Sequence, residues 1–131
     1  MFVGLNPSTA NEENNDPTIR SVFRIANNNG YGGFYMTNCF PYISTNPEDL
    51  KDFGNTVLND QILYKVAAIC QHVVFAWGAF PVIKDLGRDI EMTGMFPNAK
   101  ALAINKNGSP KHPLYCKSET ALVEWNPSHK K

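Results

Sequence analysis

Short apolar runs alternate along this chain with segments of helical character, and this alternation restricts the folds it can adopt. The apolar runs, each expected to form a strand, are residues 1–5, 33–38, 72–77 and 99–104. The segments expected to form helices between them are residues 16–30, 56–70 and 80–88. Strands that alternate with helices form a parallel sheet with helices on both faces and right-handed crossovers. The sequence therefore predicts a single three-layer α/β domain, over residues 1–131, with a four-stranded parallel sheet.

Capping residues and apolar spacing support the two longer helices. Asp16 suits the cap of the first helix, Pro17 its first turn and Gly30 its end. The apolar residues expected to face the core are Ile19, Val22, Phe23 and Ala26 in the first helix, and Leu58, Ile62, Val66 and Ile69 in the second. Two shorter helices are expected, one beginning at residues 46–47 and one within residues 118–125.

The distribution of charge bears on the partners of the chain. The net charge is zero over 131 residues, but residues 1–99 carry six Lys and Arg against ten Asp and Glu, whereas residues 100–131 carry six Lys against two Glu. A strongly basic nucleic-acid-binding domain is not indicated, so nucleic acid stays open as a partner without support from net charge. No apolar run is long enough to span a membrane and no signal peptide is visible, so no membrane partner is expected. The oligomeric state is left open.

The three cysteines, Cys39, Cys70 and Cys116, are widely spaced and form no CxxC pair or zinc pattern. Reduced thiols in a cytoplasmic protein are the simplest interpretation. Cys39 is expected to be a small buried residue rather than a nucleophile. The sequence has no GxGxxG motif, P-loop or metal-ligand spacing, so no cofactor and no metal are expected.

Each expected strand ends on, or is followed by, side chains suited to binding or catalysis. These are Asn6-Pro7, Asn38, Trp77-Gly78 and His112-Pro113. Ligands of parallel sheets bind beyond the carboxyl ends of the strands, so these groups are expected to meet at one edge. An Asn amide offers a donor and an acceptor, which matches the edge of a nucleobase, and a His can donate to an oxygen that gains negative charge. Aromatic side chains in the same loops can stack on a base.

The candidate site residues fall into two groups. The candidate catalytic residues are Asn6 and His112. The candidate substrate-binding residues are Pro7, Ser8, Arg20, Asn38, Phe40, Tyr42, Trp77, Gly78 and Tyr115. The expected ligand contains a nucleobase.

Several of these residues also have a simpler structural interpretation. Asn6 before a proline is most often a turn residue, Asn38 a strand-end cap and Trp77 a core residue. Arg20 is explained equally well by an ion pair with Asp16, four residues earlier, and by a place near a phosphate. The position of the two asparagines and the histidine at one sheet edge favours a functional role.

Short motifs in a fixed order cover nearly the whole chain. They are LNPSTAN, DPTIR, GYGG, TNCFPYISTNP, ND, AWGA and GSPKHPLY. In this order they resemble an uncharacterised prokaryotic and phage family, domain of unknown function 1643. Members of that family have a further short stretch before the LNPS strand, so a shortened N-terminus is expected here.

A more distant resemblance is to the uracil-DNA glycosylase superfamily. Residues 4–7, GLNP, match the GxxP turn after strand one, which reads GINP in the mismatch-specific branch. TNCFPYISTNP, VVFAWGA and HPL are similar to later motifs of that superfamily. The resemblance implies a uracil-DNA-glycosylase-like fold. It also implies that Asn6 positions the attacking water, Asn38 hydrogen-bonds the base edge and His112 stabilises the leaving base.

Departures from that pattern bear on the function. Asn6 stands where the most active branch has Asp, and an amide cannot act as a general base. Hydrolysis is expected to be slow unless a carboxylate of Glu12, Glu13 or Asp16 enters the site. Leu114 follows His112-Pro113 where glycosylases commonly have Ser, and the four cysteines of the iron–sulfur branches are missing.

Two functions are therefore expected for this chain. The first is hydrolysis of an N-glycosidic bond to a nucleobase, in DNA or in a nucleotide. The alternative is a non-catalytic nucleobase- or nucleotide-binding module of the same fold. A third class is an interaction or structural domain that kept only the fold.

Overall fold

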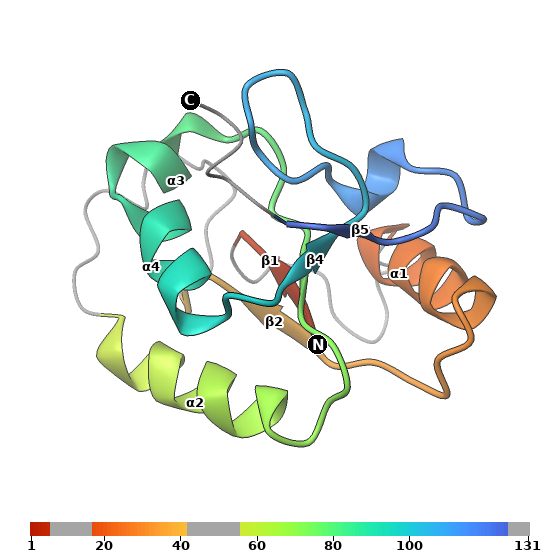
Figure 1. The fold of residues 1–131 in the computed structure, drawn as a ribbon, viewed down its shortest axis with the longest axis horizontal. Helices are drawn as coiled ribbons and strands as arrows, with labels where there is room; N and C mark the ends of the chain where they lie inside the picture. Colours follow the sequence, from red (N-terminus) through yellow and green to blue (C-terminus); the bar gives the residue numbers. More distant parts are fainter. Residues whose placement is uncertain (6–16, 42–55, 126–131) are drawn as a thin grey trace.

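A mixed five-stranded sheet forms the centre of the computed structural model, which describes residues 1–5, 17–41 and 56–125 (Figure 1). The strands are β1 (Phe2–Gly4), β2 (Met36–Asn38), β3 (Val74–Phe75), β4 (Lys100–Ala101) and β5 (Val123–Glu124). Their order is β2-β1-β3-β4-β5, with β1 to β4 parallel and β5 antiparallel to β4. The four parallel strands therefore end at one edge, called here the carboxyl edge of the sheet.

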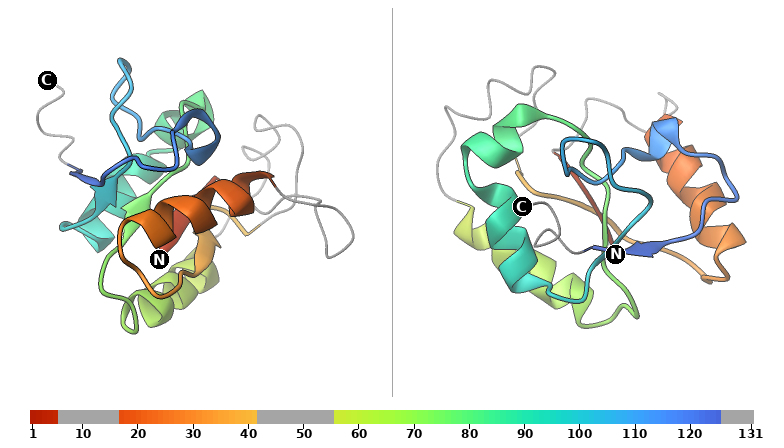
Figure 2. Two further views of the ribbon diagram at one scale, coloured as in Figure 1. Left: turned by 90° about the vertical axis from the view of Figure 1, so that its right-hand side faces the viewer. Right: turned by 45° about the horizontal axis from the view of Figure 1, so that its top comes forward.

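Helices cover both faces of the sheet, as expected for an α/β fold. They are α1 (Pro17–Asn28), α2 (Val57–Ala67), α3 (Pro81–Asp85), α4 (Arg88–Met95) and the short 3₁₀ helix η2 (Pro113–Tyr115). Helix α1 lies on one side of the sheet, whereas α2, α3 and α4 lie on the other (Figures 1 and 2). The α/β class and the layered arrangement predicted from the alternation are confirmed.

Alternate residues of β1 and β3 contribute to the two hydrophobic cores. Phe2 and Val74 point to the core that contains Val22, Ile25 and Ala26 of α1. The next residues along the same strands, Val3 and Phe75, belong to the larger core under α2, α3 and α4. The side-chain period of two along a strand explains this division. Buried strands with apolar residues on both faces are typical of parallel sheets.

The fifth strand corrects the prediction of a four-stranded, purely parallel sheet. The helix predicted within residues 118–125 is wrong, because residues 118–119 form a turn and Val123 then pairs with Ala101 of β4. Trp125 follows, donates its backbone N–H to the Ala99 carbonyl at 3.0 Å and is buried. A strand at the edge of a sheet has unpaired backbone groups. Strand β5 therefore supplies hydrogen-bond partners for β4, and Trp125 places its indole in the larger core.

The helix predicted at 80–88 is interrupted, and α4 was missed. Gly87 adopts a positive φ of 69° and donates its N–H to the Lys84 carbonyl, which ends α3. Such a φ is readily adopted by glycine and rarely by other residues. A second helix, α4, then begins at Arg88. The helix predicted to begin at residues 46–47 lies outside the described residues.

The predicted inward face of α2 is largely wrong, although Val66 is partly buried against the larger core as predicted. Leu58 is 70% exposed and Ile62 and Ile69 are also exposed, whereas Leu63 is 1% exposed. The reason is that Asn59, four residues before Leu63 and so on the same face of the helix, makes hydrogen bonds toward the end of β2. These polar contacts orient the helix so that Leu58 and Ile62 face away from the core.

The predicted inward face of α1 needs only a small correction. Val22 and Ala26 face the core as predicted, and Ile25 is also buried there. Phe23 is exposed instead.

In the part of the chain that the structure describes, no helix combines the length and the apolar character needed to cross a membrane.

Candidate functional site

A cavity of about 420 Å³ lies beyond the carboxyl ends of β3 and β4. Its lining residues come from the segment after β3 and from the chain around η2: Gly78, Ala79, Phe80, Asn105, Lys111, His112, Leu114 and Tyr115. The cavity, called here the His112 cavity, brings together three of the predicted site residues, Gly78, His112 and Tyr115. Its volume is in the range typical of small-molecule sites, and its place agrees with the rule for parallel sheets.

A hairpin after β4 carries the chain back to this cavity. Ile104 and Pro110 form an antiparallel bridge, and Asn105 donates its backbone N–H to the Ser109 carbonyl at 2.8 Å. Inside the turn, the Asn107 side-chain oxygen accepts hydrogen bonds from the N–H and hydroxyl of Ser109. The turn is therefore closed by its own polar groups, as is usual for segments rich in Asn, Ser and Gly.

Two backbone hydrogen bonds then attach the returning chain to the sheet. Gly78 donates its N–H to the Pro110 carbonyl at 3.0 Å, and Lys111 donates to the Ala103 carbonyl at 2.9 Å. These bonds fix the residues on both sides of the cavity relative to β3 and β4. The backbone at His112 is therefore held by the sheet.

Gly78 lets the imidazole approach the end of β3 closely. Its φ is +84°, and a Cβ at this position would lie 3.3 Å from the His112 Cβ and 3.5 Å from Cδ2. Any other L-residue would be strained by the backbone conformation and would also crowd the ring. The glycine in the AWGA segment therefore has a direct structural reason at the site.

The hydrogen bonding of His112 defines which ring nitrogen carries a proton. The backbone N–H of Leu114 donates to Nδ1 of His112 at 3.2 Å, which caps η2. A ring nitrogen that accepts a hydrogen bond is unprotonated, so the neutral imidazole carries its proton on Nε2. The Tyr115 ring lies 6.0 Å from the imidazole, tilted by 60°, and is largely exposed. The cavity thus combines an imidazole N–H donor with an aromatic ring at its mouth.

Asn38 lies at the same carboxyl edge, as the last residue of β2, but does not line the His112 cavity. Its side chain lies beside β1, since a Cβ built on Gly4 would lie 2.9 Å from Oδ1 of Asn38. Glycine at position 4 is therefore required for the amide to occupy this place. In the sheet, β1 and β3 separate Asn38 from the strand that leads to His112.

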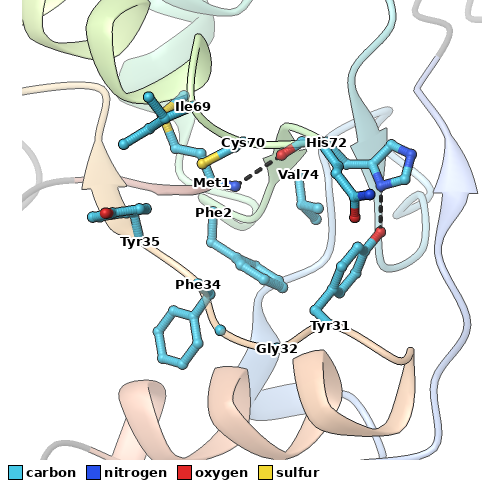
Figure 3. Close-up of a pocket in the computed structure, with 12 residues that line it drawn as sticks. Met1, Phe2, Tyr31, Gly32, Phe34, Tyr35, Ile69, Cys70, His72 and Val74 are labelled. Carbon is cyan, nitrogen blue, oxygen red and sulfur yellow. Dashed lines mark hydrogen bonds between the residues drawn. The ribbon is translucent and has the colours of Figure 1, made fainter.

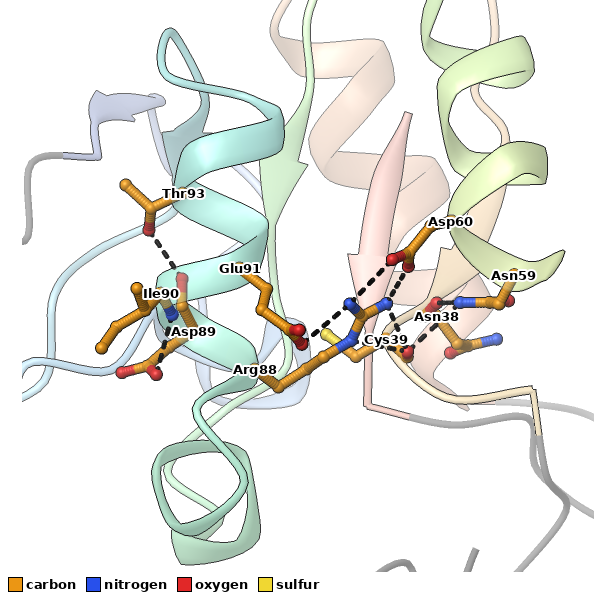
Figure 4. A network of polar contacts seen from close by, with 9 residues as sticks. All are labelled: Asn38, Cys39, Asn59, Asp60, Arg88, Asp89, Ile90, Glu91 and Thr93. Carbon is orange, nitrogen blue, oxygen red and sulfur yellow. Dashed lines mark hydrogen bonds and ion pairs between the residues drawn. The ribbon is translucent and has the colours of Figure 1, made fainter. Parts of the chain in front are cut away.

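A buried arginine holds the end of β2 (Figure 4). The side chain of Arg88, 2% exposed, donates from Nε and Nη2 to the Cys39 carbonyl at 3.1 and 2.9 Å. Its other donors reach the Asp60 carboxylate on α2, and Nη1 also reaches Glu91 at 3.3 Å. These contacts, called here the Arg88 network, link α4, α2 and the end of β2. Buried charges are normally paired in this way.

Asn59 completes the grip on the same backbone. Its side-chain amide donates to the carbonyls of Asn38 and Cys39 at 2.9 and 3.2 Å, as drawn in Figure 4. The two carbonyls beside the Asn38 side chain therefore receive four hydrogen bonds from Asn59 and Arg88. This arrangement restricts the backbone from which the Asn38 amide projects.

The same environment sets the protonation of Arg88 and Cys39. Burial lowers the pKa of Arg88, but the hydrogen bond to Asp60 raises it, with a net upward shift that keeps the guanidinium charged. Burial raises the pKa of the Cys39 thiol, and the nearby Arg88 charge only partly offsets this. A thiol with a raised pKa is a poor nucleophile. Cys39 is buried, as expected for a small core residue.

Comparison with known families gives one match. The chain matches the family described as "Protein of unknown function (DUF1643)" over residues 1–114. The chain belongs to this family. The matched segment contains the Arg88 network and His112. Neither the curated proteins nor the solved structures gave a match to the chain.

The other predicted site residues lie away from the lining of the His112 cavity or outside the described residues. Asn6, Pro7, Ser8 and Tyr42 lie outside the described residues. Phe40 and Trp77 are buried in the larger core. The Trp77 indole is 1% exposed and packs against Phe75, with ring centroids 4.6 Å apart. Arg20 is exposed on α1, and its expected partner Asp16 lies outside the described residues.

A second cavity, of about 520 Å³, lies at the opposite edge, where the strands begin (Figure 3). Aromatic and apolar residues dominate its lining, and it contains none of the predicted site residues. His72 accepts a hydrogen bond from the Met1 ammonium at its carbonyl and shares one with the Tyr31 hydroxyl, 2.6 Å from Nδ1. Through these contacts His72 joins the segment before β3 to Met1 and to the chain after α1, which is a structural role.

Sequence reasoning missed the Arg88 network. The dipeptide ND at residues 59–60 is a motif of the resemblance, but nothing in it indicates what it binds. Arg88 stands between Gly87 and Asp89, so its immediate neighbours do not indicate that it is buried. Within residues 1–5, 17–41 and 56–125, no group of three or more His, Cys, Asp or Glu side chains is arranged to hold a metal ion.

Proposed function

We propose that the chain binds a nucleobase-containing ligand in the His112 cavity and hydrolyses its N-glycosidic bond. The observation that carries this proposal is the fixed imidazole in the cavity, with Nδ1 occupied by the Leu114 N–H and the neutral-ring proton on Nε2. A donor held in one orientation can stabilise negative charge as it develops, without reorganising during the reaction. The exposed Tyr115 ring offers a surface for stacking.

The reaction follows from this donor. The bond between the sugar C1′ and the base nitrogen lengthens, its electron pair goes to the base, and the sugar becomes oxocarbenium-like. The oxygen of a water molecule forms the new bond to C1′, and the proton that it loses ends on the base. The Nε2–H of His112 donates to an oxygen of the departing base anion.

The distant resemblance to the uracil-DNA glycosylase superfamily supplies the other roles in this proposal. Asn6 positions the attacking water and Asn38 hydrogen-bonds the base edge, within a uracil-DNA-glycosylase-like fold. Because Asn38 lies outside the described lining of the His112 cavity, this role requires the base to extend from the cavity along the carboxyl edge toward the end of β2. The parallel order of β1 to β4, with helices on both faces, supports this fold assignment. The rigid hold of Asn59 and Arg88 on the backbone beside Asn38 supports a role for that amide in recognition.

A nucleobase- or nucleotide-binding module without catalysis is the second candidate. The observation that favours it is the chemistry of the cavity, whose described lining contains no Asp or Glu. Without a carboxylate, this lining offers no negative charge to oppose the positive charge of the sugar, and the neutral His112 ring, with Nδ1 occupied, presents a donor rather than a base. Under this alternative, bases bind in the same place and are not released.

Base release tests the two candidates. The purified protein is incubated with single- and double-stranded uracil-containing DNA and with mixed nucleotides, and free bases are detected by mass spectrometry. We compare His112→Gln with His72→Gln, a matched histidine variant outside the cavity. Release by the wild type and by His72→Gln, but not by His112→Gln, supports hydrolysis. If bases bind but are not released, the binding module is supported. If no base binds and none is released, the proposed function is refuted.

A further inference from the structure

The charge of the His112 cavity suggests which part of a ligand it recognises. Among its described lining residues, Lys111 carries a full charge and no carboxylate accompanies it. His112 and Asn105 add hydrogen-bonding groups, and Phe80, Leu114 and Tyr115 add apolar or aromatic surface. A cavity with a cation and no anion favours an anionic ligand.

Lys111 differs from Lys84 in the contacts of its ammonium group. The Lys84 ammonium donates to the Asn107 carbonyl at 2.8 Å and so supports the hairpin. Within the described residues, the ion pairs are made by Arg88, and the Lys111 ammonium has no hydrogen bond or ion pair. Its backbone is nevertheless fixed, through the hydrogen bond to Ala103. Burial raises the pKa of the Cys116 thiol, and the Lys111 charge lowers it by a smaller amount. A firmly anchored lysine that has no hydrogen bond or ion pair among the described residues is suited to an external anion.

The position of this charge relative to the imidazole fits a nucleotide. Lys111 and His112 are consecutive, so their Cα atoms are about 3.8 Å apart, and both line the same cavity. In a nucleotide the sugar separates the base from the phosphate. A lysine side chain is long and flexible, so it can reach a phosphate across the sugar while the neighbouring imidazole contacts the base.

We infer that Lys111 forms a phosphate subsite of the His112 cavity, so the ligand is a nucleotide rather than a free base or a nucleoside. This inference rests on the proposed function, because it requires a base to occupy the cavity. It adds the class of ligand and a residue that discriminates between ligands. The shared chemistry is a phosphate group, carried either by a free nucleotide or by the backbone of a single strand.

The test compares ligands with and without phosphate. Dissociation constants are measured by calorimetry for uridine, cytidine, adenosine and guanosine, for their 5′-monophosphates and for a short single-stranded oligonucleotide, at low and moderate salt. The proteins are the wild type, Lys111→Gln and the control Lys106→Gln, whose lysine is exposed and does not line the cavity. Thermal unfolding of each variant confirms that it is folded.

The inference predicts that one or more monophosphates bind the wild type about tenfold or more tightly than the matching nucleoside, as expected for a charge-assisted contact. Lys111→Gln removes this difference and leaves nucleoside affinity unchanged. For the oligonucleotide, it also reduces the slope of log K against log salt by about one. Lys106→Gln retains the difference. If the oligonucleotide exceeds the nucleosides in affinity by more than the monophosphates do, a strand backbone is the source of the phosphate.

Other results overturn the inference in separable ways. Equal affinity for nucleosides and nucleotides in the wild type refutes the phosphate subsite and leaves the proposed function intact. The phosphate subsite is also refuted if Lys111→Gln weakens the binding of nucleosides and nucleotides equally, or if Lys106→Gln has the same effect as Lys111→Gln. If no nucleoside, nucleotide or oligonucleotide binds the wild type, the proposed function fails and the subsite fails with it.

Discussion

Replacing Arg88 with Met tests how much the Arg88 network contributes to stability. The change removes two hydrogen bonds to the Cys39 carbonyl and the paired contacts with Asp60. Breaking a buried ion pair by removing one partner costs about 3–5 kcal/mol. The Asp60 side chain is 26% exposed, so water can partly solvate the orphaned carboxylate. We therefore expect Arg88→Met to lower the free energy of unfolding by about 3 kcal/mol, at the low end of this range.

The double variant Arg88→Met/Asp60→Leu separates the orphaned charge from the loss of contacts. Apolar replacements of buried ion pairs are often neutral or stabilising. The Cys39 carbonyl keeps the hydrogen bond from Asn59, so it is not left unsatisfied. We expect the double variant to lie within about 1 kcal/mol of the wild type. Glu91→Gln is the control. The Glu91 side chain is 57% exposed, so this change should alter stability by about 0.5 kcal/mol or less.

Urea unfolding, followed by circular dichroism, gives these free energies. Arg88→Met within about 1 kcal/mol of the wild type would refute the claim that the network stabilises the fold. A double variant as unstable as Arg88→Met would refute the explanation by an orphaned carboxylate, since the carboxylate is then absent. In that case the lost hydrogen bonds to the end of β2 would account for the effect.

Three further predictions follow from single sites. Gly78→Ala should lower stability by about 1–3 kcal/mol, because it forces a side chain into a positive φ; urea unfolding checks this, and an unchanged midpoint contradicts it. Cys39 should react with a thiol reagent far more slowly in the native protein than in denaturant, because burial raises the pKa of its thiol; equal rates contradict this. Leu63→Ala should cost about 2–5 kcal/mol and Leu58→Ala less than about 0.5, measured by unfolding; equal losses would contradict the orientation of α2.

The alternation of apolar runs and helical segments was sufficient to predict the α/β class and the parallel arrangement of β1 to β4. It was not sufficient for β5, because the short run that contains Val123 pairs with the open edge of β4, a partner visible only in the assembled sheet. The face of α2 was also misjudged. Apolar residues occur on several sides of this helix, and the polar contacts of Asn59 with the end of β2 decide its orientation.

For the site, the rule that ligands bind beyond the carboxyl ends of parallel strands was informative. It grouped Gly78 with His112, which the structure brings into contact at the end of β3. It could not show that Asn38 lies beside β1, outside the described lining of the cavity. The Arg88 network was beyond sequence reasoning, because its guanidinium joins residues 28 and 49 positions away in the chain.

The measurement that tests the central claim most directly is a long-range ¹H–¹⁵N correlation spectrum of the histidine rings, recorded with and without nucleotides. We predict that the neutral His112 ring carries its proton on Nε2 and that its signals shift on nucleotide addition, while those of His72 do not. Signals of His112 that stay unchanged while those of His72 shift would place the ligand at the opposite edge and contradict the account. A proton on Nδ1 of His112 would contradict the proposed donor.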